Sequence, residues 1–127
     1  MALVFNWLAI IIAAVVGLVF GWLWYAPFLF GKKYTVQEKK KIPRYNMAIY
    51  FVSALVTAFV LSNLLVIGSV LSISSALFLG FLVWLGFFAM LRLGDVLWRG
   101  KSWGYYLANI FHDLIKVLIM AAILFFI

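Results

Sequence analysis

The stretch that decides the fold is Trp103–Ile127, which reads WGYYLANIFHDLIKVLIMAAILFFI. It is apolar for longer than the ~20 residues that a helix needs to cross the hydrocarbon core of a bilayer, so it predicts a transmembrane helix. Its polar residues are Asn109, His112, Asp113 and Lys116. Their spacing of three, four and seven residues places them on one stripe of that helix. Ionisable groups inside a membrane are costly and usually face protein or water, so this stripe marks a functional or assembly site.

The composition extends this interpretation to the whole chain. Of its 127 residues, 69% are hydrophobic and 10% are charged, and the mean hydropathy is +1.23. A soluble domain is nearer to half apolar and about a quarter charged. The sequence predicts an all-α protein, a four-helix transmembrane bundle of two antiparallel hairpins in a single membrane domain. Its spans are expected at residues 5–28, 46–67, 76–97 and 103–127.

The first span resembles a retained helix more than a signal peptide. Residues 1–7 carry no basic residue, and no small-residue cleavage site follows before the aromatic end of the run. We therefore expect this segment to stay in the membrane as part of the bundle.

The net charge of +7 is concentrated in two connections. The third connection carries Arg99 and Lys101, whereas the second carries no charge. The first connection, residues 29–45, is a basic loop whose cations are expected to meet lipid headgroups: Lys32, Lys33, Lys39, Lys40, Lys41 and Arg44. The positive-inside rule then predicts that both basic loops are cytoplasmic and both termini lie outside a cell membrane. No interleaving of basic and aromatic residues predicts nucleic-acid binding.

The residue types exclude several kinds of chemistry. The chain has no cysteine, which excludes disulfides, thiol nucleophiles and thiolate metal sites. A single histidine, His112, is too few for a metal site, and Met120 lies two turns further along the same helix, so one haem could not use both. No phosphate-binding loop, nucleophile elbow or zinc motif occurs. We expect no metal, no cofactor and no enzymatic activity.

Small residues recur every fourth position in the first span. They are Ala9, Ala13, Gly17 and Gly21. Such a ladder allows another helix to approach closely, so these residues are predicted to form a helix-packing face. The pattern leaves open whether that packing lies within one protomer or between protomers.

Helix depth relates the polar stripe to two charges near the end of the third span. With a rise of about 1.5 Å per residue, Arg92 lies at the depth of Asp113. By the same estimate, Asp95 lies at the depth of Asn109 or His112. These side chains are therefore predicted to meet across the hairpin that joins the third and fourth spans.

The predicted charged cluster contains two acids and two bases, which compensate one another. Its members are Arg92, Asp95, Asn109, His112, Asp113 and Lys116. Asp113 and Lys116 are also neighbours on one helix face, and the imidazole would decide the net charge near neutral pH. Such a cluster can lock two helices together, dock a partner helix or relay protons or ions, with catalysis the least favoured role.

Four short motifs are distributed along the chain: Asn6-Trp7-Leu8-Ala9-Ile10; Gly21-Trp22-Leu23-Trp24-Tyr25-Ala26-Pro27 with Phe30-Gly31-Lys32; Gly94-Asp95-Val96-Leu97 with Gly100 and Lys101; and Asn109 followed by His112. Together they resemble the Domain of Unknown Function 1761 family of small prokaryotic membrane proteins. The resemblance implies four helices, a bacterial or archaeal cell membrane and no established activity. It also implies a shared site or scaffold made of Asn6, Trp24, Tyr25, Pro27, Asp95, Asn109 and His112. Asp113 and Lys116 lie outside that pattern, which favours a docking role for them.

Two functions follow as hypotheses. The first is a non-enzymatic scaffold or accessory subunit in the lipid bilayer. It would form a homo-oligomer or a hetero-complex with other membrane subunits through the small-residue face of the first span and the polar face of the fourth. The alternative is a small proton- or ion-coupled transporter or channel that uses the charged cluster. Four helices make a thin pathway, so a transporter would need to be an oligomer.

Overall fold

A computed structural model of the chain describes residues 6–24 and 45–127. The described residues are helical, with short turns between helices and no strand. The helices, in chain order, are α1 (Trp7–Trp24), α3 (Tyr45–Ile67), α4 (Ile73–Val83), the π-helix η1 (Trp84–Ala89), α5 (Met90–Arg99) and α6 (Trp103–Phe126). Because α4, η1 and α5 follow one another directly, they form one long span, Ile73–Arg99. All four spans are long and apolar enough to cross a membrane, which confirms the all-α, four-helix fold class.

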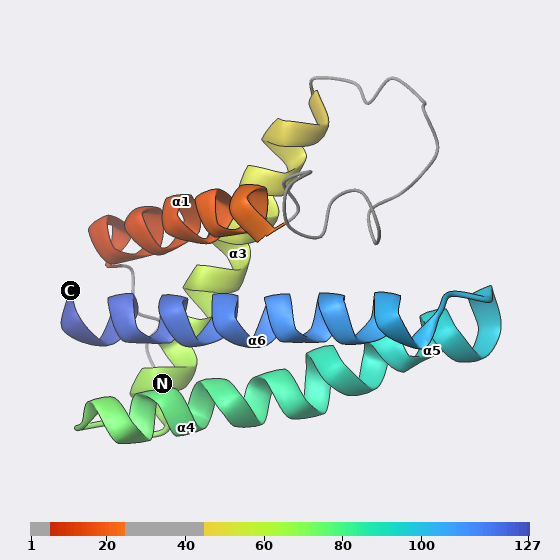
Figure 1. The fold of residues 1–127 in the computed structure, drawn as a ribbon. Coiled ribbons are helices and arrows are strands. Elements are labelled where there is room, and N and C mark those ends of the chain that lie inside the picture. The colour runs from red at the N-terminus through yellow and green to blue at the C-terminus, as the bar shows by residue number, and fades with distance from the viewer. Residues whose placement is uncertain (1–5, 25–44) are drawn as a thin grey trace.

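Helix α6 is the central element of the bundle. It packs against α1, α3 and α4, and Figure 1 shows it lying between α1 and α4 while α3 crosses these helices at a steep angle. Successive spans run in opposite directions. The bundle therefore has a basic end, where α5 ends and α6 begins near Arg99 and Lys101, and a serine end, where α3 ends and α4 begins near Ser69 and Ser72.

The core lies where α1, α3 and α6 meet. Its buried members are Ile10, Ala13, Ala58, Leu61, Val117, Met120 and Ala121. Ile10 and Met120 are the largest side chains that are fully buried. This apolar layer occupies the half of the bundle nearer the serine end.

The predicted packing face of α1 is used within the protomer. Ala9, Ala13, Gly17 and Gly21 are all buried, and a Cβ atom built on Gly17 would lie 3.1 Å from Lys116 Cε of α6. The structure thus answers the question that the sequence left open. The same face is not available for contact with another subunit, because α3 and α6 already cover it.

The helix boundaries differ slightly from the predicted spans. Residues 25–28 of the first predicted span lie outside the described residues. The third span begins at Ile73 because the Ser72 hydroxyl caps it by accepting a hydrogen bond from the amide of Ser75 (3.2 Å). It ends at Arg99 because Gly100 takes a left-handed conformation with φ of 70°, which glycine adopts without a Cβ clash.

The π-helix η1 interrupts the third span at the level of the middle of α6. A π-turn displaces backbone hydrogen bonds, so other groups must satisfy them. Here the Tyr106 hydroxyl donates to the Ala89 carbonyl at 2.8 Å. The Trp84 indole donates to the Ile110 carbonyl at 2.7 Å. Two buried aromatic side chains therefore fasten the irregular segment to α6.

A prediction about stability follows from the end of α3. Ser69 has φ of 51°, and it closes the helix through hydrogen bonds from Ser69 N to Val66 O and from Val70 N to Leu65 O. A left-handed conformation strains any residue with a Cβ. Ser69→Gly should therefore raise the free energy of unfolding by about 0.5–1 kcal/mol.

Equilibrium unfolding in mixed micelles would measure this change. Ser74→Gly is the matched control, because Ser74 lies in α4, where glycine lowers helix stability. Equal effects of the two substitutions would contradict the argument from the turn.

Candidate functional site

The polar stripe of α6 faces the inside of the bundle. Asn109, His112 and Asp113 are 6%, 4% and 4% exposed, and Lys116 is half-buried. The same helix turns its apolar residues Phe111 and Leu107 outwards, where they are about half exposed. The sequence pattern therefore places three of the four polar side chains against other helices of the same protomer.

Arg92 of α5 and Asp113 of α6 form an ion pair. Arg92 donates from Nε to one carboxylate oxygen and from Nη2 to the other, the latter at 3.3 Å. Two parallel donors fix the carboxylate as well as neutralising it. The Asp113 side chain is 5% exposed and that of Arg92 is 35% exposed, so the pair connects the interior with the surface of α5.

His112 lies on the other side of the same carboxylate. Its Nδ1 is 3.0 Å from Asp113 Oδ1, which makes Nδ1 the protonated nitrogen that donates to the carboxylate. On α1, the Phe20 ring stacks on the imidazole with centroids 5.5 Å apart and planes at 8°. Asp113 thus orients the imidazole, and the opposite nitrogen, Nε2, faces Gly21 of α1.

Trp24 holds the end of α1 against α6. Its indole donates to the Ala108 carbonyl at 3.1 Å, and its ring lies 6.2 Å from the His112 ring. The resemblance placed Trp24 in a shared site or scaffold. In the structure it contacts the site directly, whereas the neighbouring Trp22 is 61% exposed.

Lys116 does not form an ion pair with Asp113. Its ammonium instead donates to the Tyr50 hydroxyl of α3 at 3.0 Å and lies 4.8 Å from the centroid of that ring. The Lys116 side chain runs past Gly17, and a Cβ on Gly17 would also lie 3.4 Å from Met120 Sδ. Tyr50 was not predicted as a site residue, because nothing in its sequence neighbourhood distinguishes it from other aromatic residues near a span end.

Asp95 lies outside the buried part of the predicted cluster. It pairs with Arg99, one turn along α5, at 3.6 Å, and the expected contact with Asn109 or His112 is not among the contacts of the described residues. Asn109 donates from Nδ2 to the Tyr105 carbonyl at 2.8 Å. Within the described residues, Asp95 thus pairs outside the predicted cluster, and the neutrality of the cluster stays a prediction. With neutral histidine, the described part of the cluster contains two cations, Arg92 and Lys116, and one buried carboxylate, that of Asp113.

Some predicted residues cannot be placed. The basic loop cations Lys32, Lys33, Lys39, Lys40, Lys41 and Arg44 lie outside the described residues, as do Tyr25 and Pro27. Asn6 is described and caps α1, because its Oδ1 accepts from the amide of Ala9 at 3.3 Å. The resemblance placed Asn6 in a shared site or scaffold, and in the structure it begins the helix that covers the site.

Residues 6–24 and 45–127 contain no group of three His, Asp or Glu side chains that could hold a metal ion. A haem ligand role for His112 meets a steric objection. A Cβ on Gly21 would lie only 3.5 Å from Nε2, and Phe20 covers the ring face. A porphyrin on Nε2 would have to displace α1.

Comparison with known proteins places the chain in a family. The family described as "Protein of unknown function (DUF1761)" matches residues 8–125. The chain belongs to this family. The match confirms the resemblance read from the four motifs, and the family description assigns no activity to a DUF1761 protein. No curated protein and no solved structure matches the chain.

The two Arg–Asp pairs generate a prediction. Asp113→Asn removes the partner of a partly buried guanidinium, which should lower the free energy of unfolding by about 2–3 kcal/mol, somewhat less than for a fully buried pair. The longer pair of Asp95 with Arg99, whose side chains are 22% and 76% exposed, should contribute about 0–1 kcal/mol. Asp95→Asn is therefore the matched control, and equilibrium unfolding in mixed micelles measures both. Equal losses in the two variants would show that burial of the Arg92–Asp113 pair does not govern its contribution.

Proposed function

We propose that this membrane protein is a small proton- or ion-coupled carrier whose site is the Arg–Asp–His group, defined as Arg92, Asp113 and His112. One observation carries the proposal. The group lies inside the protomer, with Asp113 between the guanidinium and the imidazole. An assembly site would instead present its charges at a lateral surface.

The chemistry of the group supports proton handling. Histidine is the side chain that changes its charge near neutral pH, and Asp113 fixes the orientation of this imidazole at 3.0 Å. Arg92 and the His112 imidazole both lie against the Asp113 carboxylate, so a positive charge on the imidazole would be attracted by an adjacent anion. The apolar layer around Ile10 and Met120 separates this group from the serine end. The structure then corresponds to a state closed on that side, and transport requires this layer to open.

The orientation and location form part of the same proposal. Arg99 and Lys101 lie at one end of the bundle, and the opposite turn between α3 and α4 carries no charge. By the positive-inside rule, the basic end faces the cytoplasm of a cell membrane and both termini face outwards. The Arg–Asp–His group would then be nearer to the cytoplasmic side.

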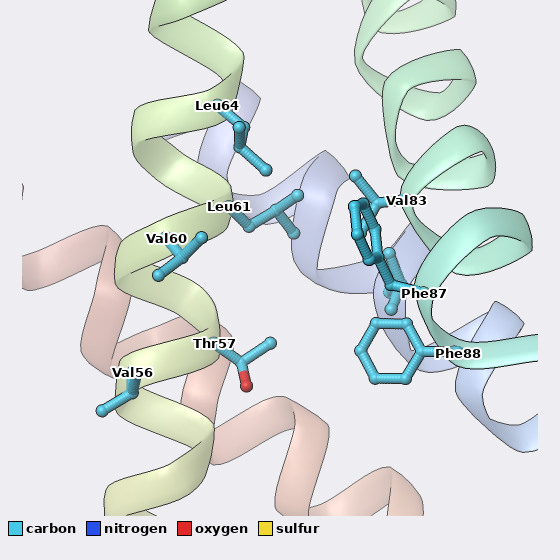
Figure 2. Close-up of a pocket in the computed structure, with 9 residues that line it drawn as sticks. Val56, Thr57, Val60, Leu61, Leu64, Val83, Phe87 and Phe88 are labelled. Atoms are coloured by element: carbon cyan, nitrogen blue, oxygen red, sulfur yellow. The ribbon is translucent and has the colours of Figure 1, made fainter. Parts of the chain in front are cut away.

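An accessory subunit is the second candidate, and it needs a different surface from the one predicted. An apolar groove between two spans is such a surface. Figure 2 shows one wall from α3 facing another from α4 and η1. The labelled residues are Val56, Thr57, Val60, Leu61, Leu64, Val83, Phe87 and Phe88. A helix of a partner or of a second copy would fit such a groove through van der Waals packing.

An enzyme is the third candidate function, and we propose that the protein is not one. An oriented Asp–His pair resembles part of a general-base arrangement. The chain contains no thiol, and the sequence holds no recognised nucleophile motif.

Flux measurements test the carrier. Proteoliposomes with an imposed pH gradient should show pH-dependent flux, reported by an internal pH dye. His112→Gln and Asp113→Asn should each reduce it by about tenfold or more, as expected when a proton-transfer group is removed. Lys101→Gln is the control, because Lys101 is exposed at the surface of the basic end. Absence of flux in the unmodified protein, or equal flux in all variants, would exclude a carrier that works through this group.

Cross-linking tests the accessory subunit. Because the chain has no cysteine, single-cysteine variants are clean probes. In native membranes, Val60→Cys in the groove should cross-link to a second copy or a foreign subunit. Val19→Cys, on a lipid-facing side of α1 with similar exposure, should not. Native mass spectrometry after mild extraction would identify the partner, and a monomer with no cross-link from either site would remove this candidate.

A further inference from the structure

Lys116 leaves a positive charge in the bundle that the described residues do not balance. The described carboxylates are those of Asp95 and Asp113. Asp95 pairs with Arg99 at the surface, and Asp113 is held by Arg92 and His112. The partner of the Lys116 ammonium is the neutral hydroxyl of Tyr50. A cation at this depth is expensive unless an anion accompanies it.

Two polar groups lie beside Gly21, where α1 has no side chain, and Lys116 is hydrogen-bonded to one of them. A Cβ on Gly21 would lie 3.3 Å from Tyr50 Oη and 3.5 Å from His112 Nε2. The Lys116 ammonium is hydrogen-bonded to that same hydroxyl at 3.0 Å. A lysine, a tyrosine and a histidine from two helices thus converge against the glycine face of a third.

We propose that a small monovalent anion, a halide or a short carboxylate, binds between Lys116 Nζ, Tyr50 Oη and His112 Nε2. This inference rests on the proposed carrier and names its substrate class. Ammonium and hydroxyl both donate hydrogen bonds to an anion. Neutral His112 carries its proton on Nδ1, so Nε2 becomes a donor only when a second proton arrives. Binding of the anion and uptake of a proton would therefore favour each other.

The charged groups on each neighbouring element agree with this coupling. On α6 itself these are Asp113 and Lys116. On α5, Arg92 lies at the site while Asp95 and Arg99 pair with each other. On α3 the titratable groups are Tyr45 and Tyr50. The described part of α1 contributes aromatic rings and glycines but no charge. Without an anion, protonated His112 would face two cations and one carboxylate. An anion in this place would remove one unit of that net positive charge, so it would favour the arrival of a proton on His112 by simple Coulomb attraction.

The test is a titration of the purified protein in zwitterionic lipid nanodiscs at about pH 6 and about pH 8. Sodium chloride and sodium formate serve as separate probes, which distinguishes a halide from a carboxylate. Ionic strength is held constant with a bulky sulfonate salt. The readout is the unfolding temperature as a function of anion concentration. Saturable stabilisation is expected, and it should be stronger at the lower pH.

Single substitutions test whether the anion binds at this site. Lys116→Met removes the charge but keeps a flexible chain beside Gly17, and it should weaken binding by about tenfold or more. Tyr50→Phe should weaken it by about fivefold, and His112→Gln should abolish the difference between the two pH values. Lys101→Met is the matched control, because Lys101 lies over the ring of Tyr105 at the surface as Lys116 lies over that of Tyr50.

Two results would overturn the inference. A salt effect that does not saturate, or that is equal in Lys116→Met and Lys101→Met, would mean that no anion site exists. The third acid of the chain, Glu38, lies outside the described residues. Saturable binding that appears only in Glu38→Gln would mean that a carboxylate of the protein itself takes the anion's place. Failure of the carrier hypothesis can be told apart from failure of the anion site. Anion binding without pH-driven flux would support the anion site and contradict transport. Flux that does not depend on chloride or formate would keep the carrier and remove this substrate class.

Discussion

The close approach of α1 to α6 is the constraint on which the rest of the structure depends. In a bilayer, apolar side chains gain little by leaving lipid for protein, so helices associate where small residues allow tight packing. On α1 this occurs along Ala9, Ala13, Gly17 and Gly21, all of which are buried. At the two glycines the space is used by polar side chains, Lys116 beside Gly17 and His112 beside Gly21. One sequence feature therefore explains both the packing and the presence of polar groups inside.

The same approach determines the chemistry of the site. With α1 in place, Phe20 stacks on the imidazole and Trp24 binds the backbone of α6. Burial excludes water from Asp113, which strengthens its attraction to Arg92 and His112. The ion pair also explains how α5 stays attached to α6 beyond the π-helix, where Trp84 and Tyr106 supply the other fastenings.

Features that depend on helical periodicity and segment length could be predicted from the sequence. The hydrogen-bond or ion-pair partner of a side chain with several possible partners could not. Four spans and a buried polar face on α6 follow from hydropathy and helical spacing, and Arg92 meets Asp113 because equal depth on a hairpin leaves few alternatives. Lys116 was expected beside Asp113, but its long side chain reaches Tyr50 on a helix whose crossing angle no local pattern encodes. Asp95 points to Arg99 on its own helix, since an i,i+4 partner at the surface needs no desolvation. The π-helix likewise has no local signal, because tertiary hydrogen bonds from α6 stabilise it.

The observed partners of Lys116 and Asp95 bear on the function of the protein. A neutral cluster of four charges needs no ligand, and it fits a role in locking or docking helices. With Asp95 paired to Arg99, the described residues of the cluster hold two cations and one anion, and a proton leaving or an anion arriving would relieve this imbalance. The His112 imidazole is placed to take part in either event. The Asp113 carboxylate orients it, and its Nε2 faces the side where Lys116 and Tyr50 meet. Under the proposed carrier function, this group would couple charge balance to occupancy of the site, which a purely structural ion pair does not require.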